Sequence, residues 1–221
     1  MEIMHIDPSQ CSRADGYKLL TNLVLPRPIA WVSTLGEGGA VNLAPFSFFN
    51  VVSSHPLYVM VSIARNEAGE LKDTARNIQA RKEFVVNLVT EELFDAMNLS
   101  AADFPPDVSE LEIAGLHAAD SSKIAVPRVA EAKASLECRL FSEQQLGSYT
   151  MFIAEVLMLH VADELVGERL HINGFAPIGR MGSPSAYCRT DKCFDLPRIS
   201  YAQWLERQAA SRKSDGSDNN L

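Results

Sequence analysis

The sequence contains no long hydrophobic run. No stretch approaches the roughly 18 consecutive apolar residues that identify a membrane-spanning helix, and the first residues lack the basic and apolar regions of a secretory signal. The 4 cysteines are scattered and form no CxxC pair, so neither a disulfide framework nor a cysteine-based metal site is indicated. These absences predict a cytoplasmic protein that has reduced thiols and no membrane contact.

The standard catalytic and nucleotide-binding motifs are also missing. There is no GxSxG, no HExxH, no GxGxxG after a predicted strand and no GxxxxGK[ST]. Glu155 and His160 share one predicted strand, but five positions separate them. In a regular sheet they face opposite sides and form no local acid–base pair, and we expect Glu155 at an exposed edge of the sheet. The sequence therefore predicts neither a metal site nor a catalytic side chain.

Positive charge is in short supply. The 28 acidic and 20 basic residues give a net charge of −8, and a protein that binds nucleic acid needs basic residues to neutralise phosphates. Nucleic acid is therefore an improbable partner, although a local basic pocket for one small phosphate remains compatible with this charge.

The composition and length fit one globular domain. With 47% hydrophobic residues in 221, the chain can bury a large core without metal or disulfide support. Apolar periodicity is lost near residue 207. We therefore expect a single domain over residues 1–206 and a disordered polar tail over residues 207–221.

Short apolar segments and turn signals dominate the ordered part of the chain. One helix is expected near residues 71–81, where Leu71, Ala75 and Ile78 recur at helical spacing. Strands are expected at residues 29–35, 40–44, 57–63, 84–89, 135–141 and 149–161. This order predicts a mainly β (β-rich α+β) fold, with a closed or nearly closed antiparallel barrel and a few short helices.

The segment Asn42-Leu43-Ala44-Pro45-Phe46-Ser47-Phe48-Phe49-Asn50 is unusual for a strand. It combines three aromatic residues with a proline that interrupts hydrogen bonding, and we expect it to leave the sheet and offer backbone groups to a flat polar ligand. Lys72-Asp73-Thr74 opens the predicted helix, where N–H groups and a lysine favour an anion. Taken singly, these features also fit a solvated strand end and an ordinary helix cap.

Several of these segments together resemble the flavin reductase-like, FMN-binding split-barrel family. The resemblance is carried by residues 27–34 (RPIAWVST), 42–50 (NLAPFSFFN), 72–74 (KDT) with 77–78 (NI), 84–88 (FVVNL) and 177–180 (PIGR). It extends from about residue 20 to residue 190, and the motifs occur in the family's order. It implies a Greek-key split β-barrel that forms a homodimer, with FMN at or near the subunit interface.

The resemblance also implies which residues contact the cofactor. Ser33 and Thr34 are expected beside the flavin, residues 44–50 along its ring, and Ser62, Lys72 and Thr74 at the ribityl chain and phosphate. The full set of expected contacts is Ser33, Thr34, Ala44, Pro45, Phe46, Ser47, Phe48, Phe49, Asn50, Ser62, Lys72 and Thr74. His55 departs from the family pattern, and we expect it to face solvent.

The implied activity is that of an NAD(P)H-dependent flavin reductase. Hydride would pass from NADH or NADPH to flavin N5, which requires placement of two rings rather than an acid–base pair. Such an enzyme can serve as the reductase of a two-component monooxygenase, with an oxygenase as partner. The alternative is an FMN-binding electron carrier or flavin-storage protein without a nicotinamide site, because the sequence shows no dinucleotide fingerprint.

Overall fold

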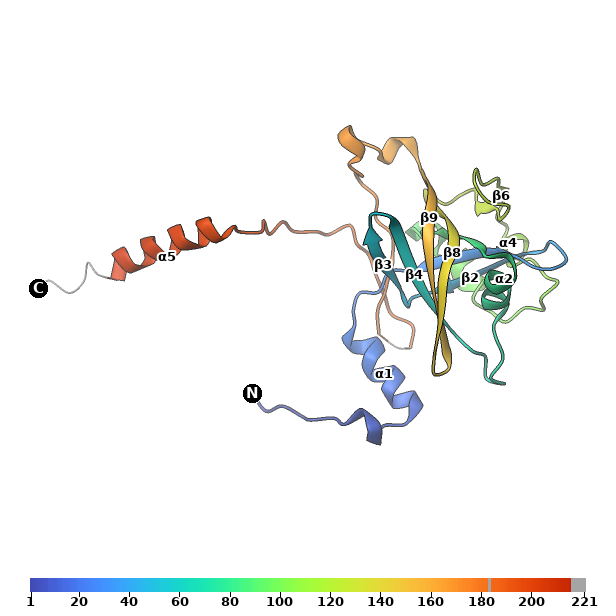
Figure 1. Ribbon diagram of the computed structural model, residues 1–221, viewed down its shortest axis with the longest axis horizontal. Helices are drawn as coiled ribbons and strands as arrows, with labels where there is room; N and C mark the ends of the chain where they lie inside the picture. The colour runs from blue at the N-terminus through green and yellow to red at the C-terminus, as the bar shows by residue number, and fades with distance from the viewer. Residues whose placement is uncertain (183, 216–221) are drawn as a thin grey trace, which may run out of the picture. The chain divides into compact units, whose positions relative to one another are not determined.

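The computed structural model describes residues 1–182 and 184–215 (Figure 1). The chain divides into two units, Met1–Asp191 and Lys192–Leu221. The first unit holds the sheet and the hydrophobic core. Within the described ranges, no helix is long and apolar enough to cross a membrane.

A seven-stranded antiparallel sheet forms the body of the first unit, in the order β2-β1-β5-β8-β9-β4-β3. Three hairpins, β1–β2, β3–β4 and β8–β9, supply six of the strands, and β5 joins two of the hairpins by pairing with β1 and β8. The strands are β1 (Ala30–Leu35), β2 (Val41–Phe46), β3 (Phe49–Ser54), β4 (Leu57–Ala64), β5 (Glu83–Asn87), β8 (Ala134–Leu146) and β9 (Tyr149–Val161).

Chain connectivity forces this sheet to roll up. Strands β2 and β3 form its two outer edges, yet only Ser47 and Phe48 separate them in the sequence. In a flat sheet of seven strands the edges would lie about 29 Å apart, whereas three Cα–Cα steps span about 11 Å. The sheet is therefore a barrel with an unpaired seam between β2 and β3. The expected mainly β split barrel is confirmed.

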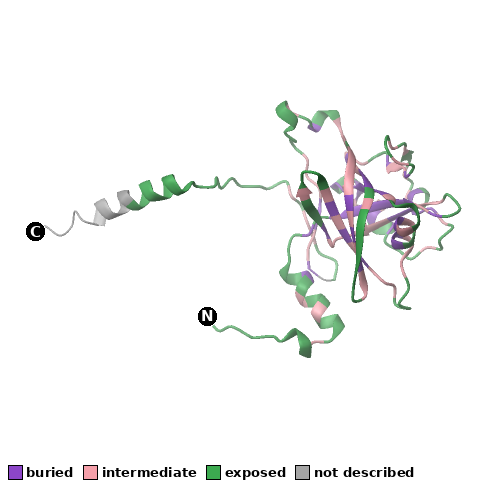
Figure 2. Cartoon of the chain, in the orientation of Figure 1, coloured by how far each residue is buried: buried purple, intermediate pink, exposed green. Residues whose placement is uncertain are grey.

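The barrel interior contains one apolar core, and a second apolar cluster lies on the other face of β1. Ala30 and Val32 point into the interior together with residues such as Phe84 and Phe152, whereas Trp31 belongs to the second cluster. Strand β1 is consequently buried on both faces, as the purple colour of the sheet centre illustrates (Figure 2). This double burial explains the apolar run Ala30-Trp31-Val32 at the start of β1.

Short helices and minor strands complete the fold. Helix α2 is amphipathic and buries Thr74, Ala75 and Ile78 against the barrel, as the helical spacing predicts. The α-helices are α1 (Arg13–Leu23), α2 (Asp73–Arg81), α3 (Phe94–Leu99), α4 (Glu110–Ile113) and α5 (Tyr201–Asp215). The 3₁₀ turns are η1 (Pro8–Gln10), η2 (Glu91–Leu93), η3 (Asp163–Leu165) and η4 (Glu168–Leu170). The minor strands are β6 (Ala118–Ala119), β7 (Arg128–Val129), β10 (Gly179–Arg180) and β11 (Tyr187–Cys188).

The segment around Pro45 departs from its expected structure. Residues 42–46 stay in the sheet, and Pro45 pairs with Trp31. The proline is tolerated because β2 is an edge strand, where one side of the backbone makes no ladder bonds. Only Ser47 and Phe48 leave the sheet, because β3 resumes at Phe49.

The polar tail expected over residues 207–221 lies partly outside the described residues. Helix α5 reaches Asp215, and residues 216–221 are not described. Its start carries a capping box: Gln203 N donates to Ser200 Oγ at 3.2 Å, and Ser200 N donates to Gln203 Oε1 at 2.8 Å. Residues 192–206, which we expected to belong to the main domain, fall in the second unit.

Candidate functional site

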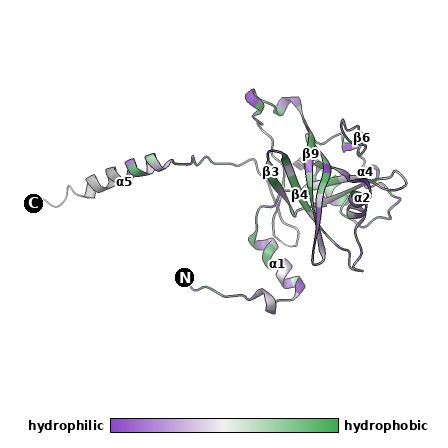
Figure 3. Cartoon of the chain, viewed as in Figure 1, coloured by the Kyte–Doolittle hydropathy of each residue, from purple (hydrophilic) through white to green (hydrophobic). Residues whose placement is uncertain are grey.

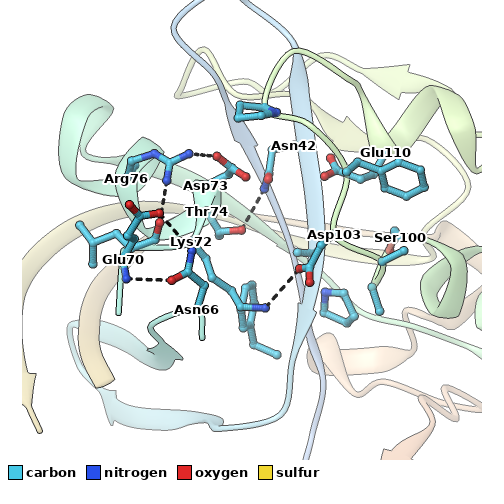
Figure 4. A pocket seen from close by; sticks show the side chains of 18 residues that line it. Asn42, Asn66, Glu70, Lys72, Asp73, Thr74, Arg76, Ser100, Asp103 and Glu110 are labelled. Carbon is cyan, nitrogen blue, oxygen red and sulfur yellow. Dashed lines mark hydrogen bonds and ion pairs between the residues drawn. The ribbon is translucent and has the colours of Figure 1, made fainter. Parts of the chain in front are cut away.

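A crevice runs along the barrel seam to the N-terminus of α2. It consists of two adjoining cavities of about 400 Å³ and about 200 Å³, which share Pro45, Phe46 and Lys72. The larger cavity is bounded by β2, the start of α2 and the loop after α3, and Figure 4 shows its polar side chains. The smaller is bounded by residues 45–48 together with β4, β9 and α1.

The start of α2 is built to receive an anion. The first helical hydrogen bond is donated by Arg76 N to Lys72 O, so the N–H groups of residues 73–75 have no intrahelical acceptor. Helices α1 and α4 are capped by Ser12 and Ser109, whereas Lys72 gives α2 no side-chain cap. Uncapped N–H groups at the positive end of a helix, beside a lysine, favour a phosphate.

Buried hydrogen bonds hold α2 against β1 and β2. Asn42 Nδ2 donates to Thr34 Oγ1 at 3.2 Å and to Thr74 Oγ1 at 2.9 Å. Asn77 Nδ2 donates to the same Thr34 oxygen at 3.0 Å. Thr34, Asn42 and Thr74 are at most 8% exposed. This polar cluster fixes the helix start relative to the barrel.

The larger cavity is lined by four acidic side chains, Glu70, Asp73, Asp103 and Glu110, and two basic ones, Lys72 and Arg76. Asp103 Oδ1 lies 3.8 Å from Lys72 Nζ (Figure 4). Glu110 is 6% exposed, and its Oε2 accepts a hydrogen bond from Leu43 N at 2.9 Å. Burial raises the pKa of Glu110 above its ordinary value. Both basic side chains are therefore paired with an aspartate, Lys72 with Asp103 and Arg76 with Asp73, so a bound anion would compete with a carboxylate for either cation.

The seam end of the crevice is aromatic. Phe48 stacks on Tyr149 with ring centroids 5.5 Å apart, and Tyr17 lies 6.3 Å from Phe48. Ser62 N donates to Phe48 O at 2.8 Å, which ties the linker between β2 and β3 to β4. Burial raises the pKa of Tyr149, so its hydroxyl keeps its proton to a higher pH than an exposed tyrosine does.

Arg27 holds the aromatic end of the crevice in place through hydrogen bonds. It is only 6% exposed and donates to the carbonyl oxygens of Thr21, Val24 and Met181. Its Nε also donates to Ser47 Oγ at 3.4 Å. One guanidinium thus joins α1, the segment after β10 and the seam linker, which holds the crevice wall in place.

Most of the residues that the resemblance indicated lie on this crevice. Its lining contains Ala44, Pro45, Phe46, Ser47, Phe48, Ser62, Lys72 and Thr74. Thr34 contributes indirectly, through Asn42.

Three of the indicated residues lie elsewhere. Ser33 is fully buried on the other face of β1, where it donates to Pro127 O at 2.7 Å and accepts from Asn87. Phe49 packs in the barrel core, and Asn50 is exposed on β3 and accepts from Val51 N. Successive strand residues face opposite sides, so neighbours in the motif separate.

Other crevice residues were missed by the sequence analysis. Asn42 begins the recognised motif but was not singled out, and Arg27 was quoted without a role. The loop Ser100–Phe104 and Glu110 come from a region without regular periodicity. Only the fold brings that region to the cavity, so no local signal identified it.

The acidic and histidine candidates lie outside the crevice. Glu155 accepts from Arg139 Nη2 at 3.0 Å on the barrel surface. His160 instead meets the fully buried Glu137, with 2.5 Å between Nε2 and Oε1. His55 is exposed at the β3–β4 turn, and none of these side chains lines either cavity.

Comparison with known proteins identifies the family. The family described as "Flavin reductase like domain" matches residues 22–188. An uncharacterized protein of Deinococcus radiodurans is 39% identical over 226 residues, covering 99% of this chain and 100% of that protein.

Two solved structures share the fold over nearly the whole first unit. Nitrilotriacetate monooxygenase component B from Bacillus cereus has a TM-score of 0.85 and 37% identity, covering 89% of this chain and 100% of that one. The 2-nitrobenzoate 2-nitroreductase NbaA of Pseudomonas fluorescens has a TM-score of 0.82 and 34% identity, covering 90% and 98%. With the split barrel and its seam crevice, this chain belongs to the flavin reductase-like family of oxidoreductases, which implies a flavin and a nicotinamide reductant.

Proposed function

We propose that this protein binds FMN in the seam crevice and catalyses hydride transfer to it from NADH or NADPH. The proposal rests on one observation: an uncapped helix N-terminus and an aromatic seam form the two ends of a single crevice. A ligand that fits both ends has a flat ring and a phosphorylated tail. FMN has this shape and charge.

The phosphate would be held at the start of α2. Lys72 supplies a positive charge, and the N–H groups of residues 73–75 and the Thr74 hydroxyl supply donors. Hydrogen bonds from such donors to a charged acceptor are roughly twice as strong as neutral ones. Ser62 and the backbone of residues 44–46 line the path toward the seam and would hold the ribityl chain.

The ring would lie against the seam wall. Pro45 to Phe48 present backbone groups to its polar edge, and Phe48 with Tyr149 excludes water from one side. Bound FMN would supply the ring that accepts hydride at N5 and stores the electrons. The protein's part is to orient this ring and leave room for a nicotinamide in contact distance.

No ionisable side chain is assigned to the chemical step. Glu155 and His160 are engaged with Arg139 and Glu137 outside the crevice. We therefore expect that Glu155→Gln and His160→Gln variants that bind FMN are reduced by NADH or NADPH at rates within about threefold of wild type. A variant that binds FMN fully yet cannot be reduced would contradict this assignment.

Flavin titration followed by rapid mixing tests the proposal. Calorimetry should show FMN binding at micromolar concentration or tighter, with Lys72→Ala weakening it about tenfold because a charge-assisted contact is lost. Stopped-flow mixing of the FMN complex with NADH and with NADPH should bleach the absorbance near 450 nm rapidly with at least one of them. Absence of FMN binding would refute the proposal.

Slow or absent bleaching of a well-bound FMN would favour the alternative function, an electron carrier or flavin-storage protein. Turnover that depends on added free FMN would instead indicate a diffusible-flavin reductase. The comparison of turnover with and without excess FMN separates a substrate from a prosthetic group.

We further propose that the active form is a cytoplasmic homodimer. An apolar surface made by Tyr17, Leu20, Phe48 and Tyr149 adjoins the smaller cavity and would be covered by a second copy. Because one similar structure is named as a monooxygenase component B, an oxygenase that accepts reduced flavin is the partner we propose.

A further inference from the structure

The hydrogen-bond directions in the polar cluster around Asn42 single out one hydroxyl. An amide nitrogen donates and cannot accept. Asn42 Nδ2 therefore occupies a lone pair of Thr74 Oγ1, 2.9 Å away, as the dashed line in Figure 4 marks. Within the described residues, Thr74 Oγ1 accepts this bond and donates none.

The Thr74 hydroxyl lies at the larger cavity, where a ligand could accept its proton. Thr74 is 1% exposed and lies in the first turn of α2, on the lining of the larger cavity. Its hydroxyl therefore keeps a proton that a group entering the cavity can accept. A phosphate oxygen accepts hydrogen bonds and has no proton to donate. It therefore complements the Thr74 hydroxyl, which already accepts from Asn42 and is left to act as a donor.

Thr34 keeps Asn42 in this orientation. Its Oγ1 accepts from Asn42 at 3.2 Å and from Asn77 at 3.0 Å. Asn42 thus donates both amide hydrogens, one to Thr34 and one to Thr74, and bridges β1 and α2. The cluster contains three buried residues and no charged group. The orientation of the Thr74 hydroxyl therefore depends on its hydrogen bonds rather than on the electric field of a nearby charge.

We propose that Asn42 is a positioning residue that turns the Thr74 hydroxyl toward the phosphate of the bound cofactor. The inference rests on the proposed function, because it assumes that a phosphate lies at the start of α2. It adds a determinant of preference for the phosphorylated flavin over the same flavin without phosphate.

The test compares FMN with riboflavin, which has the same ring and ribityl chain but no phosphate. The ratio of the two dissociation constants, riboflavin over FMN, isolates the contribution of the phosphate. In wild type we expect a ratio of at least tenfold. A variant that merely loosens the fold weakens both ligands and leaves the ratio unchanged.

Asn42→Asp reverses the hydrogen bond. A carboxylate only accepts, so Thr74 would donate to it and present lone pairs to the phosphate. We expect the ratio to fall about tenfold, and Thr74→Val, which removes the hydroxyl, to produce a similar fall. Asn42→Ala removes the donor without adding charge and should lower the ratio about threefold, which keeps the test open should Asn42→Asp fail to fold.

The double variant, Asn42→Asp with Thr74→Val, separates the effect of reversing the hydrogen bond from the effect of adding a negative charge. If Asn42 acts through Thr74, adding Asn42→Asp to Thr74→Val lowers the ratio by no more than about twofold further. Asn77→Asp is the matched charge control, because it contacts Thr34 but not Thr74. It should lower the ratio by less than about threefold.

The possible outcomes distinguish failure of this inference from failure of the proposed FMN-binding function. An unchanged ratio in Asn42→Asp, or a full tenfold loss on adding Asn42→Asp to Thr74→Val, overturns the role of Asn42. Equal affinity of the wild-type protein for FMN and riboflavin also overturns the role of Asn42, although the proposal that the protein binds a flavin would survive. Failure of wild type to bind either flavin overturns the proposed function and the inference with it.

Discussion

At the scale of single residues, Lys72 and Asp103 form an ion pair on the lining of the larger cavity. Their atoms are 3.8 Å apart, and both side chains are partly or largely exposed. An exposed pair of this kind contributes little to stability, about 0.2–1 kcal/mol. Its importance is that Asp103 competes with any incoming anion for the same lysine.

Removing the Asp103 charge should therefore strengthen anion binding. We expect Asp103→Asn to bind FMN two- to fivefold more tightly at low salt, with the gain shrinking as salt screens the charges. Riboflavin affinity should stay within twofold. Asp107→Asn, which changes an exposed charge of the same loop outside the larger cavity, is the control. Weaker FMN binding by Asp103→Asn would show that Asp103 contacts the ligand favourably.

At the scale of elements, the β8–β9 hairpin depends on a buried carboxylate. Glu137 is fully buried and accepts hydrogen bonds from His160 Nε2 and from Ser122 N and Lys123 N, at 2.5, 2.6 and 2.7 Å. Glu137 and His160 are diagonal neighbours across the two strands. The carboxylate thereby ties the loop before β7 to the hairpin.

These contacts fix the direction of a pH effect. Burial alone would raise the pKa of Glu137, but the hydrogen bonds from His160, Ser122 and Lys123 outweigh it and hold the pKa below its ordinary value. The stabilisation is therefore complete above the unfolded-state pKa, about 4.3, and is lost as pH falls through the lower folded-state pKa.

Glu137→Gln tests this linkage. It removes acceptors from buried donors and should lower the free energy of unfolding by about 2–4 kcal/mol at pH 7. In urea unfolding from pH 7 down to pH 3, its difference from wild type should shrink in the acid range. Glu155→Gln, which alters an exposed pair with Arg139, should change the free energy by less than about 0.5 kcal/mol. A difference that stays constant with pH would rule out the titration of Glu137.

At the scale of the whole molecule, hydrophobic surface remains uncovered on the first unit. Tyr17 and Leu20 on α1 are 49% and 60% exposed, and Val51 on β3 is 68% exposed. Figure 3 shows the same character as green segments on α1, β3 and β4. Exposed apolar surface of this kind is typical of a protein–protein interface.

A charge placed on this surface should disrupt the proposed homodimer. We expect wild type to sediment as a dimer and Leu20→Arg to sediment as a monomer at the same concentration, because a buried unpaired guanidinium is costly. Ile113→Arg alters another exposed apolar residue, 49% exposed on α4, and should leave the dimer intact. A wild-type protein that sediments as a monomer would contradict the assembly.

The sequence by itself determined the local structure. The helical spacing of Leu71, Ala75 and Ile78 follows from side-chain burial along a single segment, and it is confirmed. Most of the residues expected to contact the cofactor also lie on the crevice lining, because residues 44–48 and 72–74 are each contiguous.

Only the tertiary structure decided what depends on strand register and barrel closure. Neighbours on a strand face opposite sides, so the fold alone assigns Thr34 to the crevice side and Ser33 to the hydrogen-bond network around Asn87. Register across two strands, rather than spacing along one, pairs His160 with Glu137. Packing of α3 and α4 against β2 brings Asp103 and Glu110, which carry no local signal, to the same cavity as Lys72.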